Sequence, residues 1–223
     1  MSTETVNYLD AIAQLPMGAT LLLWRVSWEE YEALLSDLTE WPGLRVSYDA
    51  GRVEIMSPSL EHEEYKDTIF SLTRVLALEL RIKVESRGSA TYKQKRLAKG
   101  AEPDTSFYVQ NVARIFGKRR IDLTVDPPPD VVVEIDTTNE SLGKFRIYAA
   151  LGVPEIWRYD GRVAQFFQLA GTDYEEIENS CAFPMLTASV LTEFVELSKT
   201  QGQSDALDAI REWARRQATN VKE

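Results

Sequence analysis

Apolar and polar positions alternate in short runs over the first quarter of the chain. Residues 44–48 and 52–56 form two such runs around Asp49-Ala50-Gly51, which predicts a β-hairpin. Ser27 and Glu30 have the spacing of a capping box and predict a helix from there to about residue 38. A further short apolar run predicts a strand at residues 20–25.

The clearest helical pattern covers residues 60–82, where His62, Tyr65, Ile69 and the leucines after them form one stripe. Residues 131–135 are apolar except for Glu134, a pattern typical of a strand buried on both faces. The remaining patterns predict strands at 88–92, 105–109, 155–159 and 163–169, a turn at 99–100, a loop over 111–129, a helix opened by a capping box at 137–140 and running to about 151, and an amphipathic helix at 204–217.

The chain shows no internal repeat, low-complexity tract or flexible linker, so a single domain over residues 1–223 is expected. Its core is placed at about 44–195, with an N-terminal extension at 1–43 and a C-terminal helix within 200–223. Strands mixed with helices predict an α/β (α+β) fold.

Composition excludes several classes of protein. One cysteine and one histidine in 223 residues rule out a disulfide framework and a zinc site built from several imidazoles or thiolates. No apolar run approaches the length of a membrane span, and the polar N-terminus is unlike a signal peptide, so a cytoplasmic location is expected. The formal net charge of -10 argues against non-specific binding to nucleic acid.

Two acidic residues stand in unusual settings. Glu134 interrupts a buried strand, where a carboxylate needs an ion pair, a metal or an exposed edge. Asp104, after Glu102-Pro103, is ordinary turn chemistry when taken alone. If the strands that carry them lie side by side, however, the two carboxylates converge and suit a hard cation such as Mg²⁺.

Three further residues are candidates. Lys144 lies one helical turn before Tyr148, either extending its stem along an apolar face or placing a cation beside a reacting phosphate. His62 continues the apolar stripe and is more often a packed residue than a ligand. Glu61 beside it suits the N-terminal helix dipole, which is a sufficient structural reason for it.

The order of these motifs resembles that of the Uma-type family of restriction endonucleases, which belongs to the PD-(D/E)XK nuclease superfamily. The resemblance covers roughly residues 28–195, and its elements occur in the family's order. They are Met56-Ser-Pro-Ser59, the histidine that opens a helix, Glu102-Pro-Asp104, Pro128-Pro-Asp130-Val-Val-Val-Glu134, Leu142-Gly-Lys144 and Gly152-Val-Pro-Glu-Ile-Trp157.

The resemblance implies a restriction-endonuclease-like core, in which helices flank a mixed central sheet and an N-terminal hairpin is added. It implies that Asp104 and Glu134 are the paired acids and metal ligands, with Mg²⁺ or Mn²⁺ as the cofactor. The superfamily lysine normally follows the second acid by two residues, but that position is Asp136 here, which transfers the role to Lys144. His62 and Glu61 match the family's residue at the start of the first core helix.

The implied activity is metal-assisted hydrolysis of phosphodiester bonds in DNA, and analogy with other nucleases of this fold suggests a homodimer. The alternative is a non-catalytic binding or assembly module that keeps the nuclease fold, which the charge of -10 and Asp136 favour. An enzyme for another phosphate substrate is a third, weaker alternative. Two basic clusters could meet DNA if they share the face of the site, namely Arg87, Lys93, Lys95, Arg96 and Lys99, and Arg114, Lys118, Arg119 and Arg120.

Overall fold

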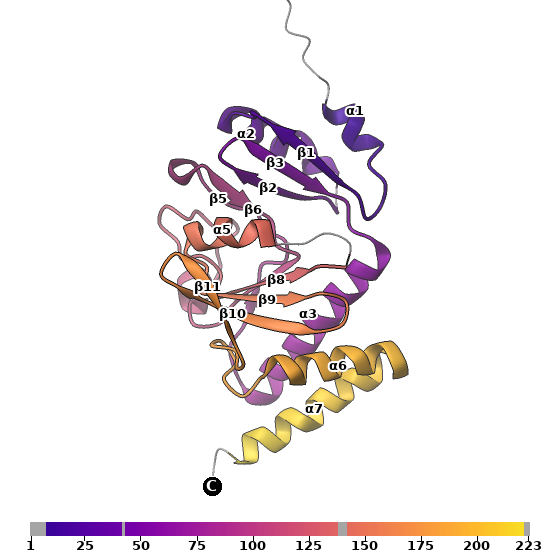
Figure 1. Ribbon diagram of the computed structural model, residues 1–223. Coiled ribbons are helices and arrows are strands. Elements are labelled where there is room, and N and C mark those ends of the chain that lie inside the picture. Colours follow the sequence, from indigo (N-terminus) through magenta and orange to yellow (C-terminus); the bar gives the residue numbers. More distant parts are fainter. Residues whose placement is uncertain (1–7, 42, 138–141, 221–223) are drawn as a thin grey trace, which may run out of the picture.

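Two β-sheets, stacked with one helix between them, organise the chain (Figure 1). The computed structural model describes residues 8–41, 43–137 and 142–220. The larger sheet, called sheet B here, has six strands in the order β11-β10-β9-β8-β7-β4, and the smaller, sheet A, has five in the order β1-β3-β2-β6-β5.

Sheet B is the predicted mixed sheet. It contains β4 (Glu85–Ser86), β7 (Thr105–Tyr108), β8 (Val131–Ile135), β9 (Glu155–Tyr159), β10 (Ala164–Ala170) and β11 (Asp173–Ile177). Strands β8 and β9 are parallel and every other neighbouring pair is antiparallel. The parallel pair is joined through α5 (Leu142–Leu151), the usual way of connecting parallel strands.

Helices cover both faces of sheet B, which explains the nearly continuous apolar run in β8. Val131, Val133 and Ile135 pack with α3 (Leu60–Leu80), α6 (Ala188–Gln201) and α7 (Gln203–Asn220). Val132, between them in sequence, packs on the opposite face with residues of α5. Because side chains alternate along a strand, Glu134 points to the same face as Val132 and therefore toward α5.

Sheet A contains the predicted N-terminal hairpin as two of its strands. It is formed by β1 (Thr20–Trp24), β2 (Arg45–Asp49), β3 (Arg52–Met56), β5 (Tyr92–Gln94) and β6 (Lys99–Ala101), all antiparallel. The helix α2 (Trp28–Asp37) begins at the predicted Ser27–Glu30 capping box and packs Tyr31 and Leu34 against one face of the sheet. Residues 92–101 join the same sheet through the pairing of β6 with β2 and of β5 with β6.

Several local predictions were wrong. Lys99 and Gly100 belong to strand β6 and not to a turn, which is made instead by the 3-10 helix η2 (Lys95–Leu97) and by Ala98 in the left-handed conformation. The strand expected at 88–92 begins only at Tyr92. The loop at 111–129 contains the short helix α4 (Val112–Ile115). The capping box expected at 137–140 lies largely outside the described residues, so α5 is described from Leu142.

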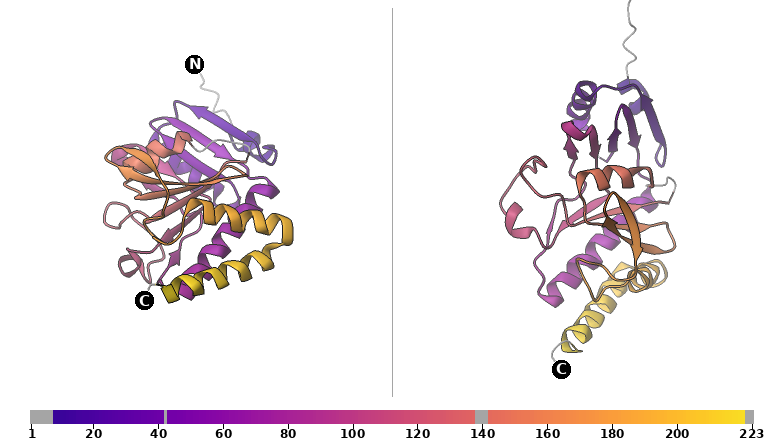
Figure 2. Two further views of the ribbon diagram at one scale, coloured as in Figure 1. Left: turned by 60° about the horizontal axis from the view of Figure 1, so that its bottom comes forward. Right: turned by 60° about the vertical axis from the view of Figure 1, so that its left-hand side comes forward.

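Five further elements were not predicted from the sequence: α1 (Tyr8–Ala13), the 3-10 helix η1 (Leu38–Glu40), strands β4 and β11, and helix α6. The predicted C-terminal helix is α7, which packs on α3 and α6 of its own chain (Figure 2). Ala206, Ile210 and Ala214 form its buried stripe. Among the described residues, none of the helices has the length and apolar content that crossing a membrane requires.

Candidate active site

Asp104 and Glu134 lie at the same end of two neighbouring strands. The backbone N–H of Asp104 donates to the carbonyl of Val133 at 3.1 Å, and Thr105 pairs with Val133 in the register of β7 and β8. Each acidic residue is only 1% exposed. An exposed edge strand for Glu134 is therefore wrong, since β8 lies between β7 and β9 in the interior of sheet B.

Glu134 is held by two residues of α5. Lys144 donates from Nζ to Oε2 at 2.7 Å, and the hydroxyl of Tyr148, one helical turn further on, donates to Oε1. Burial raises the pKa of Glu134 above its usual range, although the Lys144 ammonium opposes the shift. The placement of Lys144 one turn before Tyr148 thus aims both side chains at the same carboxylate.

Asp104 meets a different set of partners. Its Oδ2 accepts from the backbone N–H of Ile135 at 2.8 Å and lies 3.1 Å from His62 Nε2. Its Oδ1 lies 3.4 Å from Arg45 Nε and makes no hydrogen bond. Burial by itself would raise the pKa of Asp104, but the His62 and Lys144 cations outweigh it and hold that pKa below its usual value.

His62 reaches Asp104 from the first turn of α3. Ser59 caps this helix, its side chain accepting from the backbone N–H of His62, and fixes where the helix begins. The imidazole is 2% exposed. Burial lowers the pKa of His62, but its contacts with Asp104 and Glu63 outweigh burial and raise that pKa to about 9.

The structure does not bring Glu61 into this cluster. Glu61 is exposed and accepts a hydrogen bond from the Tyr65 hydroxyl at 2.7 Å, on a different side of α3. Glu63 lies beside His62 instead, with its Oε1 3.7 Å from Nδ1. Consecutive residues of a helix are rotated by about 100°, so Glu61 and Glu63 project toward nearly opposite sides of α3. Glu63 is the one that faces the cluster.

Arg45 is a residue of the cluster that the sequence did not single out. It extends from β2 of sheet A, is 6% exposed, and lies 3.2 Å from Glu63 as well as 3.4 Å from Asp104. The available signal was its place in the hairpin, where it shares a face with Ser47 and Asp49 and not with the core residues Val46 and Tyr48. The sequence did not indicate that this face of sheet A is turned toward Asp104 and Glu134.

Asp136, in the usual position of the superfamily lysine, has a structural partner. Its carboxylate accepts from Arg158 Nε on β9 at 2.5 Å, and the side chain is 2% exposed. The ion pair links the end of β8 to the neighbouring strand. The cation nearest to Glu134 comes from α5 instead.

The donor chemistry of the cluster fits a hard divalent cation. Asp104 and Glu134 offer carboxylate oxygens, and Asp104 Oδ1 is buried without a hydrogen bond. No group of three or more aspartate, glutamate, histidine or cysteine side chains suited to a metal occurs among the described residues. Mg²⁺ needs only one or two carboxylates when waters and substrate phosphate complete its coordination, so the pair of acids is a sufficient set.

Most members of the two basic clusters are paired with carboxylates. Lys93, Lys95 and Lys99 pair with Glu32, Glu29 and Asp49. Arg87 of the first cluster also pairs with Glu85, and in the second cluster Lys118 pairs with Asp126. These carboxylates neutralise much of the positive charge that the two clusters could present to DNA.

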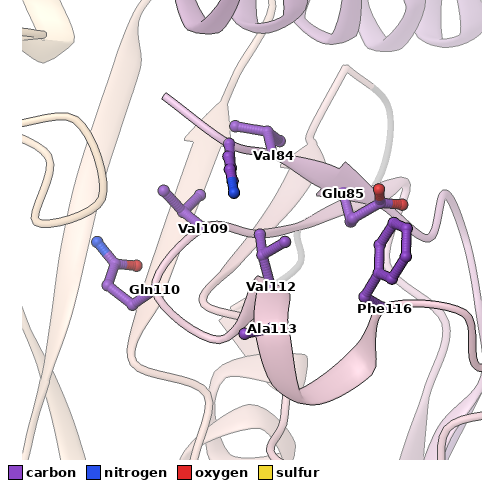
Figure 3. A pocket seen from close by; sticks show the side chains of 8 residues that line it. Val84, Glu85, Val109, Gln110, Val112, Ala113 and Phe116 are labelled. Carbon is purple, nitrogen blue, oxygen red and sulfur yellow. The ribbon is translucent and has the colours of Figure 1, made fainter. Parts of the chain in front are cut away.

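Figure 3 shows side chains that line a cavity of about 670 Å³. Val84, Val109, Val112 and Phe116 line it, together with Glu85 of the edge strand β4. Val109 follows the last residue of β7, whereas Asp104 precedes the first. The cavity is therefore at the opposite end of this strand from the candidate active site.

The segment Gly152-Val-Pro-Glu-Ile-Trp157 has a structural role. Glu155 accepts from the Trp157 indole at 2.6 Å and from the backbone N–H of Ala182 at 2.9 Å. It is 1% exposed. The segment thereby ties the loop before α6 to the start of β9, at the end of the parallel pair remote from Glu134.

A family model agrees with the sequence-based resemblance. A search of curated proteins finds no match. Among solved structures, one described as a "putative nuclease belonging to DUF820 from Anabaena variabilis ATCC 29413" is similar, with 16% identity and a TM-score of 0.47 over 67% of this chain and 90% of that one. The model of the Uma2 family, described as "Putative restriction endonuclease", matches residues 28–199. With most of its length matched, the chain belongs to the Uma2 family.

Proposed function

We propose that the protein is a metal-dependent DNA endonuclease that hydrolyses phosphodiester bonds. The description of its family supports a nuclease. One observation carries the proposal furthest: Asp104 and Glu134 are buried at the same strand ends, and Lys144 lies 2.7 Å from Glu134. Two acids and a lysine are the residue types that metal-assisted attack on a phosphodiester needs.

Each residue of the cluster has a part in this proposal. Asp104 and Glu134 would hold Mg²⁺ or Mn²⁺, which when bound acts as a Lewis acid and lowers the pKa of a water. Lys144 orients the attacking water or offsets negative charge that develops on the phosphate. His62 and Arg45 hold the Asp104 carboxylate in place from two different elements.

Cleavage of supercoiled plasmid tests the proposal. The wild-type protein is compared with Asp104→Asn, Glu134→Gln and Lys144→Met, each with Mg²⁺, with Mn²⁺ and with EDTA. Glu175→Gln on the exposed side of β11 is the matched control, because it removes one carboxylate remote from the cluster. We expect each cluster variant to lower the rate at least about a hundredfold, EDTA to abolish it, and the control to be unchanged.

A non-catalytic binding or assembly module is the second candidate. It is favoured by a specific observation, the arginine 3.4 Å from Asp104 Oδ1, which places a cation where a metal would bind. The same assay separates the two candidates. Equal background cleavage by the wild-type and all three cluster variants would leave the module as the remaining function.

A further inference from the structure

The face of sheet A opposite to α2 extends from the exposed Trp24 to the buried Arg45, which contacts Asp104. Arg52, Glu54 and Met56 of β3 lie on this face, while Val53 and Ile55 point into the core beneath α2. The register aligns three rows across the strands, which are Trp24, Arg52 and Asp49, then Leu22, Glu54 and Ser47, then Thr20, Met56 and Arg45. The third row ends in the arginine that contacts Asp104.

Helix α5 covers only part of this face. It lies between the two sheets, as the right-hand view of Figure 2 shows, and contacts β6, β5 and β2 of sheet A. Its Lys144 points to Glu134 of sheet B, whereas Arg146 pairs with Asp49 of sheet A. Strands β1 and β3 extend beyond it, which leaves Leu22 and Trp24 exposed.

A hollow of about 980 Å³ lies at this uncovered part, and we call its rim the Trp24 surface. It is formed by Trp24, Arg25, Asp49, Arg52 and Arg146. The indole of Trp24 is 66% exposed, and the Arg52 guanidinium lies 5.6 Å from its ring centroid. An indole exposed to this degree offers an apolar ring face for stacking.

The charge of the Trp24 surface differs in sign from that of the whole protein. Its basic side chains are Arg25, Arg52, Arg146 and Lys99, and their acidic partners within the described part of the chain are Asp49 and Glu54. Two positive charges are therefore left over in a chain whose formal net charge is -10. Arg25 has no ion pair among the described residues and stands in the left-handed conformation at φ 61°.

We propose that the Trp24 surface binds an unpaired nucleic-acid strand next to the candidate active site. Trp24 stacks on a base and the arginines contact phosphates, the combination that single-strand-binding grooves use. Bases of an intact duplex are stacked on one another, so an exposed indole gains most from an unpaired one. The inference rests on the proposed function and narrows its substrate to DNA with single-stranded or unpaired segments.

The separation of this surface from the acids suits a continuous strand. The five residues of β3, from Arg52 to Met56, span roughly 14 Å at the rise of a β-strand. A strand that contacts Trp24 therefore lies within roughly 14 Å of the row that ends in Arg45, the residue beside Asp104.

Fluorescence anisotropy with a labelled oligothymidine and with a duplex of equal length tests this surface. The measurements are made in EDTA, so that binding is read without cleavage. We expect tighter binding of oligothymidine than of duplex, about tenfold weaker oligothymidine binding by Trp24→Ala, and recovery by Trp24→Phe. Arg25→Asn removes a charge while tolerating the left-handed backbone, and it should reduce the salt dependence of binding.

Phe116→Ala is the matched control, because Phe116 is also an exposed aromatic residue, at 74%, but lies by the remote cavity. Any of three results would overturn the inference: the wild-type protein does not bind oligothymidine, it binds duplex more tightly than oligothymidine, or Trp24→Ala binds oligothymidine as tightly as the wild-type protein does. If plasmid cleavage depends on Glu134 while Trp24→Ala binds normally, this inference fails alone. If cleavage is absent while binding depends on Trp24, the proposed nuclease activity fails and the surface stands.

Discussion

Lys144 on α5 donates to Glu134 on β8 over 2.7 Å, and neither side chain is more than 8% exposed. The pair joins the helix that lies between the two sheets to the interior of sheet B. A buried ion pair of this kind contributes little net stability, but removal of one partner leaves the other charge without compensation. Stability and activity can therefore be separated by substitution at these two positions.

Lys144→Met should lower the free energy of unfolding by roughly 3–5 kcal/mol, because it leaves the Glu134 carboxylate buried with only Tyr148 as a hydrogen-bond donor. Urea unfolding measures the change. The double variant Lys144→Met with Glu134→Gln should regain much of this loss while remaining inactive in plasmid cleavage. An unchanged unfolding curve for Lys144→Met would contradict the pairing.

Asp136→Asn should lower the stability of the protein without lowering its rate of plasmid cleavage. Asp136 engages Arg158 and not the cluster, so its neutralisation should cost roughly 1.5–3 kcal/mol of stability, the range for hydrogen bonds to charged groups. Plasmid cleavage at a temperature where the variant is folded should remain close to that of the wild-type protein. A loss of cleavage as large as that of Lys144→Met would show that this position still serves the chemistry.

Gly100→Ala should destabilise the packing of α2 on sheet A. A Cβ at Gly100 would collide with the hydroxyl of Tyr31 and lie 3.1 Å from Cβ of Lys93. Overpacking of this kind typically costs about 1–3 kcal/mol, which thermal or urea unfolding would register.

Tyr31→Phe supplies the partner variant for that prediction. It removes the hydroxyl that the new methyl group would strike, so the double variant with Gly100→Ala should recover part of the loss. Gly143→Ala is the control, since a Cβ there meets nothing closer than Arg52 Nη1 at 3.8 Å. Equal stability of Gly100→Ala and the wild-type protein would mean that β6 and α2 are less tightly packed.

The pH dependence of stability should reveal the burial of Glu155. Burial raises the pKa of this carboxyl group above its ordinary value of 4.5, so the folded chain holds the proton more tightly than the unfolded chain. Its contribution to stability is complete below the ordinary pKa and is lost as the pH rises through the higher folded value.

Comparison with Glu155→Gln isolates this contribution. Between about pH 4 and about pH 7 the wild-type protein should lose more unfolding free energy, relative to its own value at low pH, than the variant does. Urea unfolding at the two pH values measures the difference. Parallel changes in the two proteins would mean that Glu155 titrates alike in the folded and unfolded chains.

The sequence allowed the local elements of the candidate site to be predicted, because their signals are local. Ser59 and the apolar stripe define α3, and the apolar run defines β8. The predicted convergence of the two acids depended on β7 and β8 lying side by side, and their register meets this condition. The roles of Asp104, Glu134, Lys144 and His62 in catalysis stay predictions.

The sequence could not show what depends on contacts between distant segments. The docking of Arg45 beside Asp104 requires the pairing of β2 with β6, in which Ser47 lies opposite Ala101. These two strands are far apart in the sequence. Glu61 and Glu63 are both acidic residues in the first turn of α3, and only the rotation of that helix against β7 distinguishes them. Gly100 resembled a turn glycine, whereas its lack of a side chain serves a close approach to Tyr31.

The candidate active site is shared by two sheets that are packed through α5. Arg45 belongs to sheet A, Glu134 to sheet B, and His62 to the helix that follows the hairpin. Partial opening between the layers would disperse these residues without melting either sheet. The proposed plasmid cleavage would then depend on the docking of the two layers against each other. Mild heating should abolish this cleavage before the secondary structure is lost.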